Sequence, residues 1–169
     1  MEIIRLTADY EMKPFDCGDA DLNGFLLNDA KLFAAKNLAF TFILEDEGNI
    51  VAYYSLLNDK ISKRGGNNSS WRRMKKLFPH SKHFNSYPAI KIGRLAVATS
   101  YERQGIGRML MNVIKHRLTD NTKESAFRFL TVDAYLSAVP FYERNGFKML
   151  VANDDDKHTR LMFFDMMEL

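Results

Sequence analysis

The most chemically specific segment of this chain places two glycines between arginines, in the order Arg103-Gln104-Gly105-Ile106-Gly107-Arg108. It stands between a predicted strand and the start of a predicted helix, where the first backbone N–H groups have no partner within the helix. Glycine lets a ligand approach such groups closely, and the positive end of the helix dipole attracts anions. The segment therefore predicts a seat for an anion, most simply a pyrophosphate.

Other glycine loops match this segment less well. A Rossmann fingerprint needs a third glycine where Leu110 stands, and its loop follows the strand without the spacer from Ser100 to Arg103 that is present here. A P-loop is excluded because no Gly-Lys-Ser/Thr follows. A plain strand-to-helix turn that uses glycine only for its geometry is the alternative.

The elements that must position this seat follow from hydrophobic periodicity. AIKIGRLAV (89–97) is typical of a strand, and the helix after it carries one apolar stripe made of Ile106, Met109, Leu110, Val113, Ile114 and Leu118. FRFLTVDAY (127–135) predicts another strand. A short helix from about Ala138 to Arg144 should follow, with Ser137 as N-cap, Pro140 in the first turn and Gly146 as its stop.

The rest of the chain predicts hairpins and one further helix. IIRLTADY (3–10) should form a strand, Asp19 should cap a helix, and 40–58 should form an antiparallel hairpin about Asp46–Asn49. A closing hairpin is expected about Asn153–Asp156. Strands and helices that intermix in this way give an α+β fold with a mixed sheet. We predict a single domain over residues 1–169, with an insertion at about 60–88.

The composition excludes several classes of protein. The chain has 169 residues, of which 46% are hydrophobic and 27% charged, so one core can form without a metal or disulfide. Cys17 is the single cysteine and the four histidines are scattered, so we expect neither an internal disulfide nor a metal site. We also expect no secretory signal and no membrane partner, and therefore a cytoplasmic location.

The net charge of +3 conceals a strongly basic segment. Residues 60–101 contain no acidic residue and ten cations, namely Lys60, Lys63, Arg64, Arg72, Arg73, Lys75, Lys76, Lys82, Lys91 and Arg94. A solvated basic surface is one interpretation, and a docking surface for phosphates is the other.

Two stretches resemble the signature segments of the GNAT superfamily of N-acetyltransferases. RLAVATSYERQGIGRMLM matches that family's strand, pyrophosphate loop of pattern (Q/R)xxGx(G/A) and helix, and VDAYLSAVPFYERNGFKML matches its strand and short helix ending in FYxxxGF. Glu102 departs from the first position of the loop pattern. The resemblance implies a GNAT-like fold with a mostly antiparallel central sheet flanked by helices.

The resemblance also implies a cosubstrate and residue roles. Acetyl-CoA would place its pyrophosphate on the N–H groups of Gln104, Gly105, Ile106, Gly107 and Arg108, with added charge from Arg103 and Arg108. Its pantetheine arm would pair with the backbone of Leu95, Ala96 and Val97, where an N–H would also polarise the thioester carbonyl. Tyr142 would protonate the departing thiolate, and a packed aromatic on a short helix is the alternative for that residue.

No residue stands out as a general base for the attacking amine. His116 falls on a polar helix position, and Glu45, Asp46 and Glu47 fall at a predicted turn. An α-amino group with a pKa of about 7.7 can attack unaided, whereas a lysine with a pKa of about 10.4 needs help. The lack of a base therefore favours an α-amine acceptor.

Within the superfamily, the segments PFDCGDADLNGFLLNDA and TFILEDEGNIVAYYSL, followed by a basic insertion and IGRLAV, resemble the acetyltransferase toxins of bacterial toxin–antitoxin pairs. That resemblance implies aminoacyl-tRNA as acceptor and an antitoxin as partner. Trp71, Phe78, Phe84 and Tyr87 interleave with the cations, a composition suited to RNA, so Arg72, Arg73, Lys75 and Lys76 are candidate RNA contacts.

Several alternatives stay open from the sequence. The aromatic residues of the basic segment could instead anchor it on the sheet. The acceptor could be a small-molecule or protein amine, and a non-catalytic module that binds CoA or RNA is a third possibility. The apolar C-terminal stretch LMFFDMM (161–167) could pair with a second copy to form a homodimer.

Overall fold

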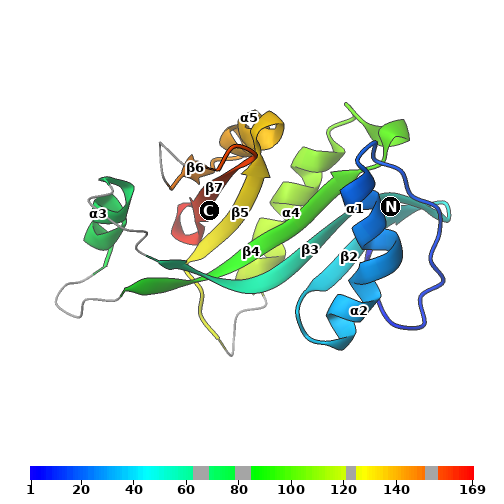
Figure 1. The fold of residues 1–169 in the computed structure, drawn as a ribbon, viewed down its shortest axis with the longest axis horizontal. Helices are drawn as coiled ribbons and strands as arrows, with labels where there is room; N and C mark the ends of the chain where they lie inside the picture. Colours follow the sequence, from blue (N-terminus) through cyan, green and yellow to red (C-terminus); the bar gives the residue numbers. More distant parts are fainter. Residues whose placement is uncertain (63–68, 79–84, 121–124, 151–155) are drawn as a thin grey trace. The chain divides into compact units, whose positions relative to one another are not determined.

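The structure is a computed structural model that describes residues 1–62, 69–78, 85–120, 125–150 and 156–169 (Figure 1). Strands and helices intermix along the chain, as expected for an α+β fold. The elements are β1 (Glu2–Arg5), α1 (Ala20–Gly24), the π-helical turn η1 (Phe25–Asp29), α2 (Ala30–Ala35), β2 (Phe40–Asp46), β3 (Asn49–Ser62), α3 (Ser69–Lys76), β4 (Ser86–Val97), η2 (Thr99–Tyr101), α4 (Ile106–Asp120), β5 (Phe129–Tyr135), η3 (Leu136–Ala138), α5 (Val139–Arg144), β6 (Lys148–Met149), β7 (Thr159–Asp165) and η4 (Met166–Glu168).

The strands form one mixed, mostly antiparallel seven-stranded sheet in the order β1-β2-β3-β4-β5-β7-β6. The pairs β1–β2, β2–β3, β5–β7 and β6–β7 are antiparallel. β7 therefore has a neighbour on each side, with Met162 and Phe163 paired both to β5 and to β6. The expectation that the stretch 161–167 offers a free strand edge to a second copy is wrong, because this stretch is paired internally and then turns into η4. A homodimer stays a prediction without that basis.

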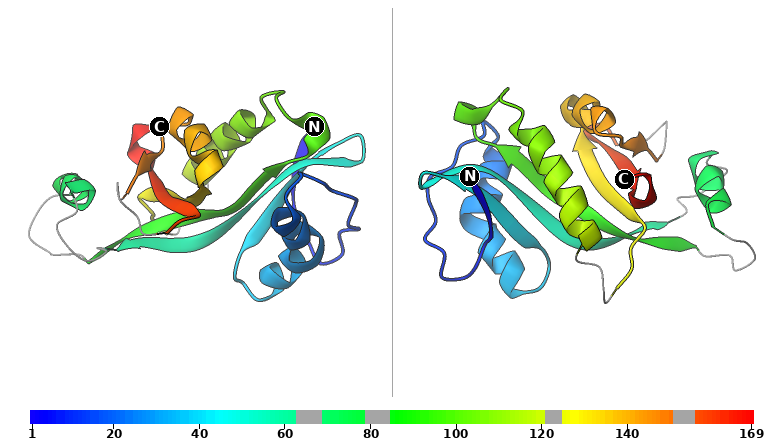
Figure 2. Two further views of the ribbon diagram at one scale, coloured as in Figure 1. Left: turned by 45° about the horizontal axis from the view of Figure 1, so that its top comes forward. Right: turned by 180° about the vertical axis from the view of Figure 1, so that it is seen from behind.

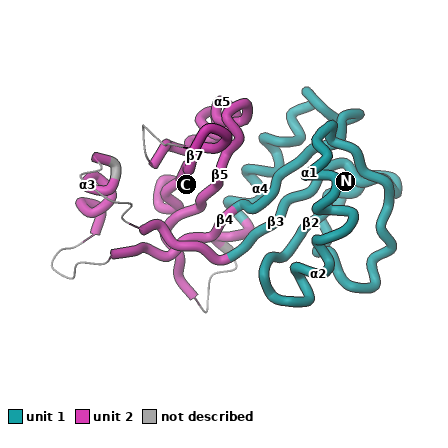
Figure 3. The backbone as a smooth tube through the Cα atoms, in the orientation of Figure 1, with its two compact units in different colours: residues 1–57, 92–116 teal, residues 58–91, 117–169 magenta. Residues whose placement is uncertain are grey.

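The chain divides into two compact units (Figure 3). Unit 1 comprises residues 1–57 and 92–116, and unit 2 comprises residues 58–91 and 117–169. Strands β3 and β4 contribute residues to both units. Both strands also extend into the segment 60–88, because β3 runs to Ser62 and β4 begins at Ser86. Ile61 on β3 and Tyr87 on β4 are buried in the core of unit 2. The single domain with an insertion over that segment stays a prediction.

Unit 1 builds its core from the two faces of its strands. Helices α1 and α2 lie on one face and α4 lies on the other (Figure 2). On the α1 side, the ring of Tyr53 meets Phe15 edge-on at 5.4 Å and lies nearly parallel to Phe25 at 6.3 Å between ring centroids. Its hydroxyl donates to the carbonyl oxygen of Leu22 at 2.7 Å, so a buried phenol fastens α1 to β3.

Local sequence signals in unit 1 are confirmed, with one addition. The Asp19 carboxylate accepts from the amides of Asp21 and Leu22 at 2.9 and 3.0 Å, as an N-cap does. The hairpin between β2 and β3 turns at Glu47 and Gly48, whose φ values are both positive. The helix that Asp19 starts is interrupted by the π-helical turn η1, which hydrophobic periodicity did not indicate.

Unit 2 packs around Phe129. This residue is buried on β5 and meets Phe163 edge-on at 5.7 Å between centroids. Arg128 forms a bidentate pair with Asp165, at 2.6 Å from Nε and 2.8 Å from Nη2 to the two carboxylate oxygens. This pair fixes β5 against the end of β7 with strong charge-assisted bonds.

The helix α5 begins differently from the prediction. Ser137 was expected to cap it, but Ser137 lies inside the 3-10 turn η3, and Ala138 stands at the cap without a side-chain bond. Pro140 sits in the first turn, where its missing N–H costs nothing. Gly146 ends the helix with a φ of +84°, as expected. The hairpin turn predicted about Asn153–Asp156 falls mostly outside the described residues.

Gly93 on β4 allows two strands of unit 1 to approach closely. A Cβ atom there would lie 2.8 Å from the Leu57 Cδ2 atom and 3.1 Å from the Ser55 Oγ atom, both on β3. Both are side-chain atoms, so the Leu57 side chain must leave its present rotamer and the Ser55 hydroxyl must give way by a few tenths of an ångström.

We predict that Gly93→Ala lowers the free energy of unfolding by about 1–3 kcal/mol, the usual cost of overpacking. The matched control is Gly24→Ala, because Gly24 is helical and its new Cβ meets nothing within 4 Å. That control should instead raise stability by roughly 0.5–1 kcal/mol, since alanine loses less backbone entropy in a helix. Urea unfolding followed by circular dichroism measures both, and equal effects of the two substitutions would contradict the steric argument.

Candidate active site

The predicted anion seat is a strained loop between β4 and α4. After η2, Arg103 adopts a φ of +58° and Gly105 a φ of +79°. A non-glycine residue in this region costs about 1 kcal/mol or more, so the surrounding structure must hold it. The side-chain Nε2 atom of Gln104 donates to the Ser100 carbonyl oxygen at 3.2 Å and links the loop to η2.

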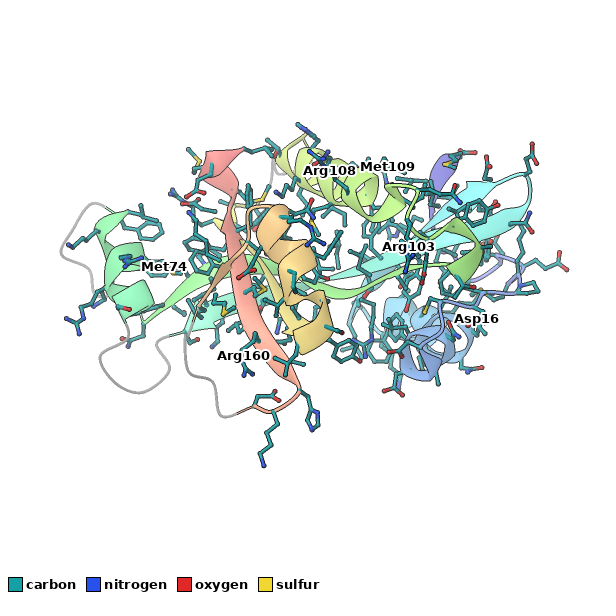
Figure 4. All side chains as sticks on the ribbon, turned by 90° about the horizontal axis from the view of Figure 1, so that it is seen from above. Asp16, Met74, Arg103, Arg108, Met109 and Arg160 are labelled. Carbon is teal, nitrogen blue, oxygen red and sulfur yellow. The ribbon has the colours of Figure 1, made fainter. Side chains whose placement is uncertain are left out.

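The loop ends by presenting helix N–H groups. The carbonyl oxygen of Gly105 accepts from the amide of Met109 at 3.0 Å, which is the first bond of α4. The amides of Ile106, Gly107 and Arg108 therefore precede the helix ladder and are available to a ligand. Arg103 and Arg108 are exposed, and Figure 4 shows both at this end of α4. One loop and the helix start after it thus combine backbone donors, the helix dipole and two exposed cations, a set of groups suited to an anion such as pyrophosphate.

The β4 residues expected to hold the pantetheine arm lie in the same unit as the loop. Ala96 is buried in the core of unit 1, while Leu95 and Val97 are partly exposed. Ala98 directly after them donates its amide to the Val51 carbonyl at 2.8 Å, which holds the strand end to β3. Glu102, the departure from the family pattern, is exposed. All residues predicted to bind the cosubstrate thus lie in unit 1, and the contacts themselves stay a prediction.

Sequence reasoning missed a set of residues that fix the start of this loop. The Thr99 amide donates to the Asp16 carbonyl oxygen at 3.0 Å. The Asp16 carboxylate in turn accepts from the Gly18 amide and the Asn23 side chain, both at 2.8 Å, and these bonds hold the pKa of Asp16 below its ordinary value. The Asp-Cys-Gly spacing was the available signal, because an aspartate that bonds two residues ahead is typical of a tight turn.

Tyr142 lies on α5 in unit 2, and only 6% of its surface is exposed. Its ring meets Phe141 and Phe147 edge-on, at 5.2 and 5.4 Å between centroids. Burial raises the pKa of this phenol, so it stays protonated across the physiological range. The described residues offer its hydroxyl no hydrogen bond, which leaves the proton available for a ligand.

The helix α3 separates its apolar and basic residues. Trp71 is 3% exposed and packs with Tyr87 at 5.3 Å between centroids, and Phe78 stacks on Tyr87 at 4.2 Å. These aromatic rings therefore anchor the helix in unit 2 and do not form a platform for stacking bases. The sequence had left both roles open for the aromatic residues of the basic segment. Phe84 falls outside the described residues.

The cations of α3 face away from that core. Arg72, Arg73, Lys75 and Lys76 are all exposed, with Trp71 and Met74 buried on the other side of the helix. Lys91, which was counted with them, is instead neutralised by Asp133 at 2.8 Å and Asp59 at 3.6 Å. Among the described cations of the basic segment, Lys60, Arg94 and the four cations of α3 are exposed, and a docking surface for phosphates stays a prediction.

The groups considered as bases are engaged or exposed. Glu45 accepts from Lys13 at 2.7 Å and from the Tyr10 hydroxyl, and these bonds hold the pKa of its carboxyl below the ordinary value. His116 is exposed on α4, as expected. Across the described ranges, no group of His, Cys, Asp or Glu could hold a metal ion, and no helix is long and apolar enough to cross a membrane.

Solved structures of bacterial toxins are similar to this chain over nearly its whole length. A tyrosine-to-phenylalanine variant of KacT is 25% identical, with 99% of this chain and 97% of that chain covered and a TM-score of 0.79. AtaTR bound with acetyl-CoA is 26% identical, with coverage of 99% and 94% and a TM-score of 0.78. AtaT complexed with acetyl-methionyl-tRNAfMet, at 23% identity, covers 99% and 96% with a TM-score of 0.78 and shares the fold.

The family follows from a direct sequence match. A family model described as an acetyltransferase (GNAT) domain matches residues 82–167, just over half of the chain. The matched stretch includes β4, the predicted anion loop, α4 and the helix that carries Tyr142. The expectation drawn from the two signature segments is confirmed, and the chain belongs to the GNAT acetyltransferase family.

Proposed function

We propose that this protein transfers the acetyl group of acetyl-CoA to the α-amine of aminoacyl-tRNA. The observation that carries the proposal is the similarity of this chain to AtaTR, with 26% sequence identity over 99% of the chain. The AtaTR structure was solved with acetyl-CoA bound. AtaT itself has been solved with acetyl-methionyl-tRNAfMet. The exposed cations of α3 support an RNA acceptor, because RNA phosphates are bound mainly by such charges.

Acetyl-CoA supplies the activated acyl group, and the loop residues bind its phosphates. The amides of Gln104, Gly105, Ile106, Gly107 and Arg108 hold the pyrophosphate, and Arg103 and Arg108 add charge. The backbone of Leu95, Ala96 and Val97 pairs with the amides of the pantetheine arm. One of these strand N–H groups polarises the thioester carbonyl, which is the largest single contribution in many acyl transfers.

The acceptor amine needs no dedicated base when it is an α-amine. Its pKa of about 7.7 leaves a useful neutral fraction at physiological pH. The amine nitrogen forms a bond to the acyl carbon as the carbon–sulfur bond breaks, and the CoA thiolate takes the proton of Tyr142. The proton lost by the attacking amine returns to the phenolate of Tyr142, directly or through water, so the protons balance.

The partners follow from the same likeness. A variant of the AtaT toxin has been solved with the C-terminus of the antitoxin AtaR. We extend this arrangement to the present chain, with a protein antitoxin as partner and, since charged tRNA is made there, the cytoplasm as location.

Tyr142→Phe should lower the rate of acetyl transfer by about 10²–10⁴-fold, the usual contribution of a positioned acid. The measurement is transfer of labelled acetyl from acetyl-CoA to a pool of charged tRNA, beside a panel of small amines and peptides. The control Tyr54→Phe removes a hydroxyl from a tyrosine that is equally buried in unit 1 and should leave the rate unchanged. Label found only on small amines or peptides would contradict aminoacyl-tRNA as the acceptor. Full activity of Tyr142→Phe would contradict the catalytic role of Tyr142.

The pH profile gives a second readout of Tyr142. The rate should rise with pH through the pKa of the α-amine, because only the neutral amine attacks. Since burial raises the pKa of Tyr142, its proton is retained as the pH rises, and no alkaline decline should occur below about pH 10. A decline near pH 9 in wild type that is absent in Tyr142→Phe would contradict the raised pKa.

Replacing Arg103 and Arg108 by Gln should weaken acetyl-CoA binding by roughly tenfold per residue at low salt, because each removes a charge-assisted phosphate contact. Isothermal titration with acetyl-CoA measures the loss. S-acetyl-pantetheine, which lacks the pyrophosphate, should bind wild type and variant equally. The control Lys36→Gln removes another exposed cation of unit 1 and should change neither affinity. An equal loss for both ligands would mean that the loop had lost its shape instead.

Replacing Arg72, Arg73, Lys75 and Lys76 by Ala should flatten the salt dependence of tRNA binding. Each lost phosphate contact changes the slope of log affinity against log salt by about 0.7–0.9. Filter binding at several salt concentrations measures this, with Lys36→Ala/Lys157→Ala as control because both lysines are exposed elsewhere. An unchanged slope in the α3 variant would show that this face does not touch the tRNA.

A further inference from the structure

Arg94 on β4 is an exposed arginine whose side chain is held in place. Its guanidinium carbon lies 4.8 Å from the centroid of the Phe25 ring, and its Nη1 atom donates to the Gly93 carbonyl oxygen at 2.9 Å. A guanidinium over an aromatic face is favourable and leaves its N–H donors free to bind at its edge. The side chain is thus ordered before any ligand arrives.

The aromatic support under Arg94 is itself rigid. Phe25 is buried, stacks with Tyr53 and meets Phe33 edge-on at 5.3 Å between centroids. Phe25 is also the first residue of the π-helical turn η1, and such turns occur frequently at functional sites. The π-helical turn therefore begins at the residue whose ring lies under the Arg94 guanidinium.

Arg94 differs from two other cations of the chain in its partners. Lys91 on the same strand has two carboxylate partners, and Lys13 has Glu45 at 2.7 Å. Among the described residues, no carboxylate pairs with Arg94. An ordered arginine without an internal anion is suited to an external one, and its fork of donors matches a phosphate better than an ammonium would.

The position of Arg94 on β4 places its positive charge next to the proposed position of the acyl group. Arg94 directly precedes Leu95–Val97, where the proposed function places the thioester. Side chains alternate along a strand, so Arg94 shares its face with Ala96, which packs in the core with Phe25. That is the face of α1 and α2, whereas α4 covers the opposite face (Figure 2). An acceptor that approaches on the α1 side therefore meets Arg94 beside the acyl carbon.

We propose that Arg94 binds a backbone phosphate of the 3′-terminal nucleotides of the acceptor, and so selects an aminoacyl-nucleotide over a free amino acid or its simple esters. This inference rests on the proposed function. The phosphate lies close to the ester that carries the amino acid, and a fixed cation next to the acyl group positions the α-amine through it. Arg94 is thus a specificity-determining residue separate from the basic face of α3.

The test compares two acceptors, aminoacyl-tRNA and the methyl ester of the same amino acid, which has no phosphate. Arg94→Gln should raise the KM for aminoacyl-tRNA about tenfold or more, and reduce its salt slope by about 0.7–0.9, the share of one phosphate contact. The KM for the methyl ester and for acetyl-CoA should not change. Arg94→Lys should keep the salt slope but recover only part of the affinity, because it lacks the fork.

The matched control is Arg5→Gln. Arg5 on β1 is also exposed and lies over a ring, with its guanidinium carbon 3.7 Å from the Phe40 centroid, but far along the sheet order from β4. The substitution Arg5→Gln removes an equivalent cation–π pair and should alter no kinetic constant. Thermal unfolding of both variants records any structural loss.

The outcomes separate this inference from the proposed function. If wild type acetylates tRNA and Arg94→Gln has an unchanged KM and salt slope, or raises the KM of both acceptors equally, the phosphate contact is overturned while the function stands. If wild type acetylates only the ester, both are overturned. A selective rise for tRNA, absent in Arg5→Gln, establishes the contact.

Discussion

The unpaired N–H groups at the start of α4 are the constraint on which unit 1 depends. Backbone donors that lack a partner are costly when buried, so the loop before them must keep them open to solvent or to a ligand. The positive φ values of Arg103 and Gly105 achieve this, and the contacts of Thr99 with Asp16 and of Gln104 with Ser100 hold the strained turn. The apolar stripe of α4 then fixes the direction in which these donors point.

The distribution of ion pairs separates structural charges from charges available to ligands. Arg128 is matched by Asp165 with two short bonds, and Lys91 by two carboxylates, so these cations hold strands together. Arg94, Arg103 and Arg108 have no carboxylate partner within the described parts of the chain. Arg94 lies on β4, Arg103 in the loop that precedes α4, and Arg108 in the first turn of α4. Under the proposed function, β4 carries the acyl-binding backbone, and β4 with the loop and helix after it carries the cations that fit the two phosphate-bearing substrates.

Local signals in the sequence predicted more of the fold than long-range ones. The Asp19 cap, the turn at Gly48 and the stop at Gly146 depend on neighbours within a few residues, and all three are confirmed. The Ser137 cap was wrong because the chain enters α5 through a 3-10 turn. The π turn at Phe25 and the internal position of β7 depend on tertiary packing, which periodicity does not report. From the sequence, the aromatic residues around α3 could either stack on bases or anchor the helix, and only the packing against the neighbouring strands distinguishes these roles.

The same limit applies to the site. Motif and spacing identified the loop and Tyr142, but not the environment that determines how the phenol acts. Burial against Phe141 and Phe147 raises the pKa of the phenol, so that full proton transfer to a thiolate of pKa about 8.5 becomes more strongly uphill than for an exposed tyrosine. A free, protonated hydroxyl therefore contributes most as a hydrogen-bond donor while charge builds on sulfur. Completion of the transfer then draws on the proton that the acceptor amine loses, which couples the departure of CoA to formation of the amide.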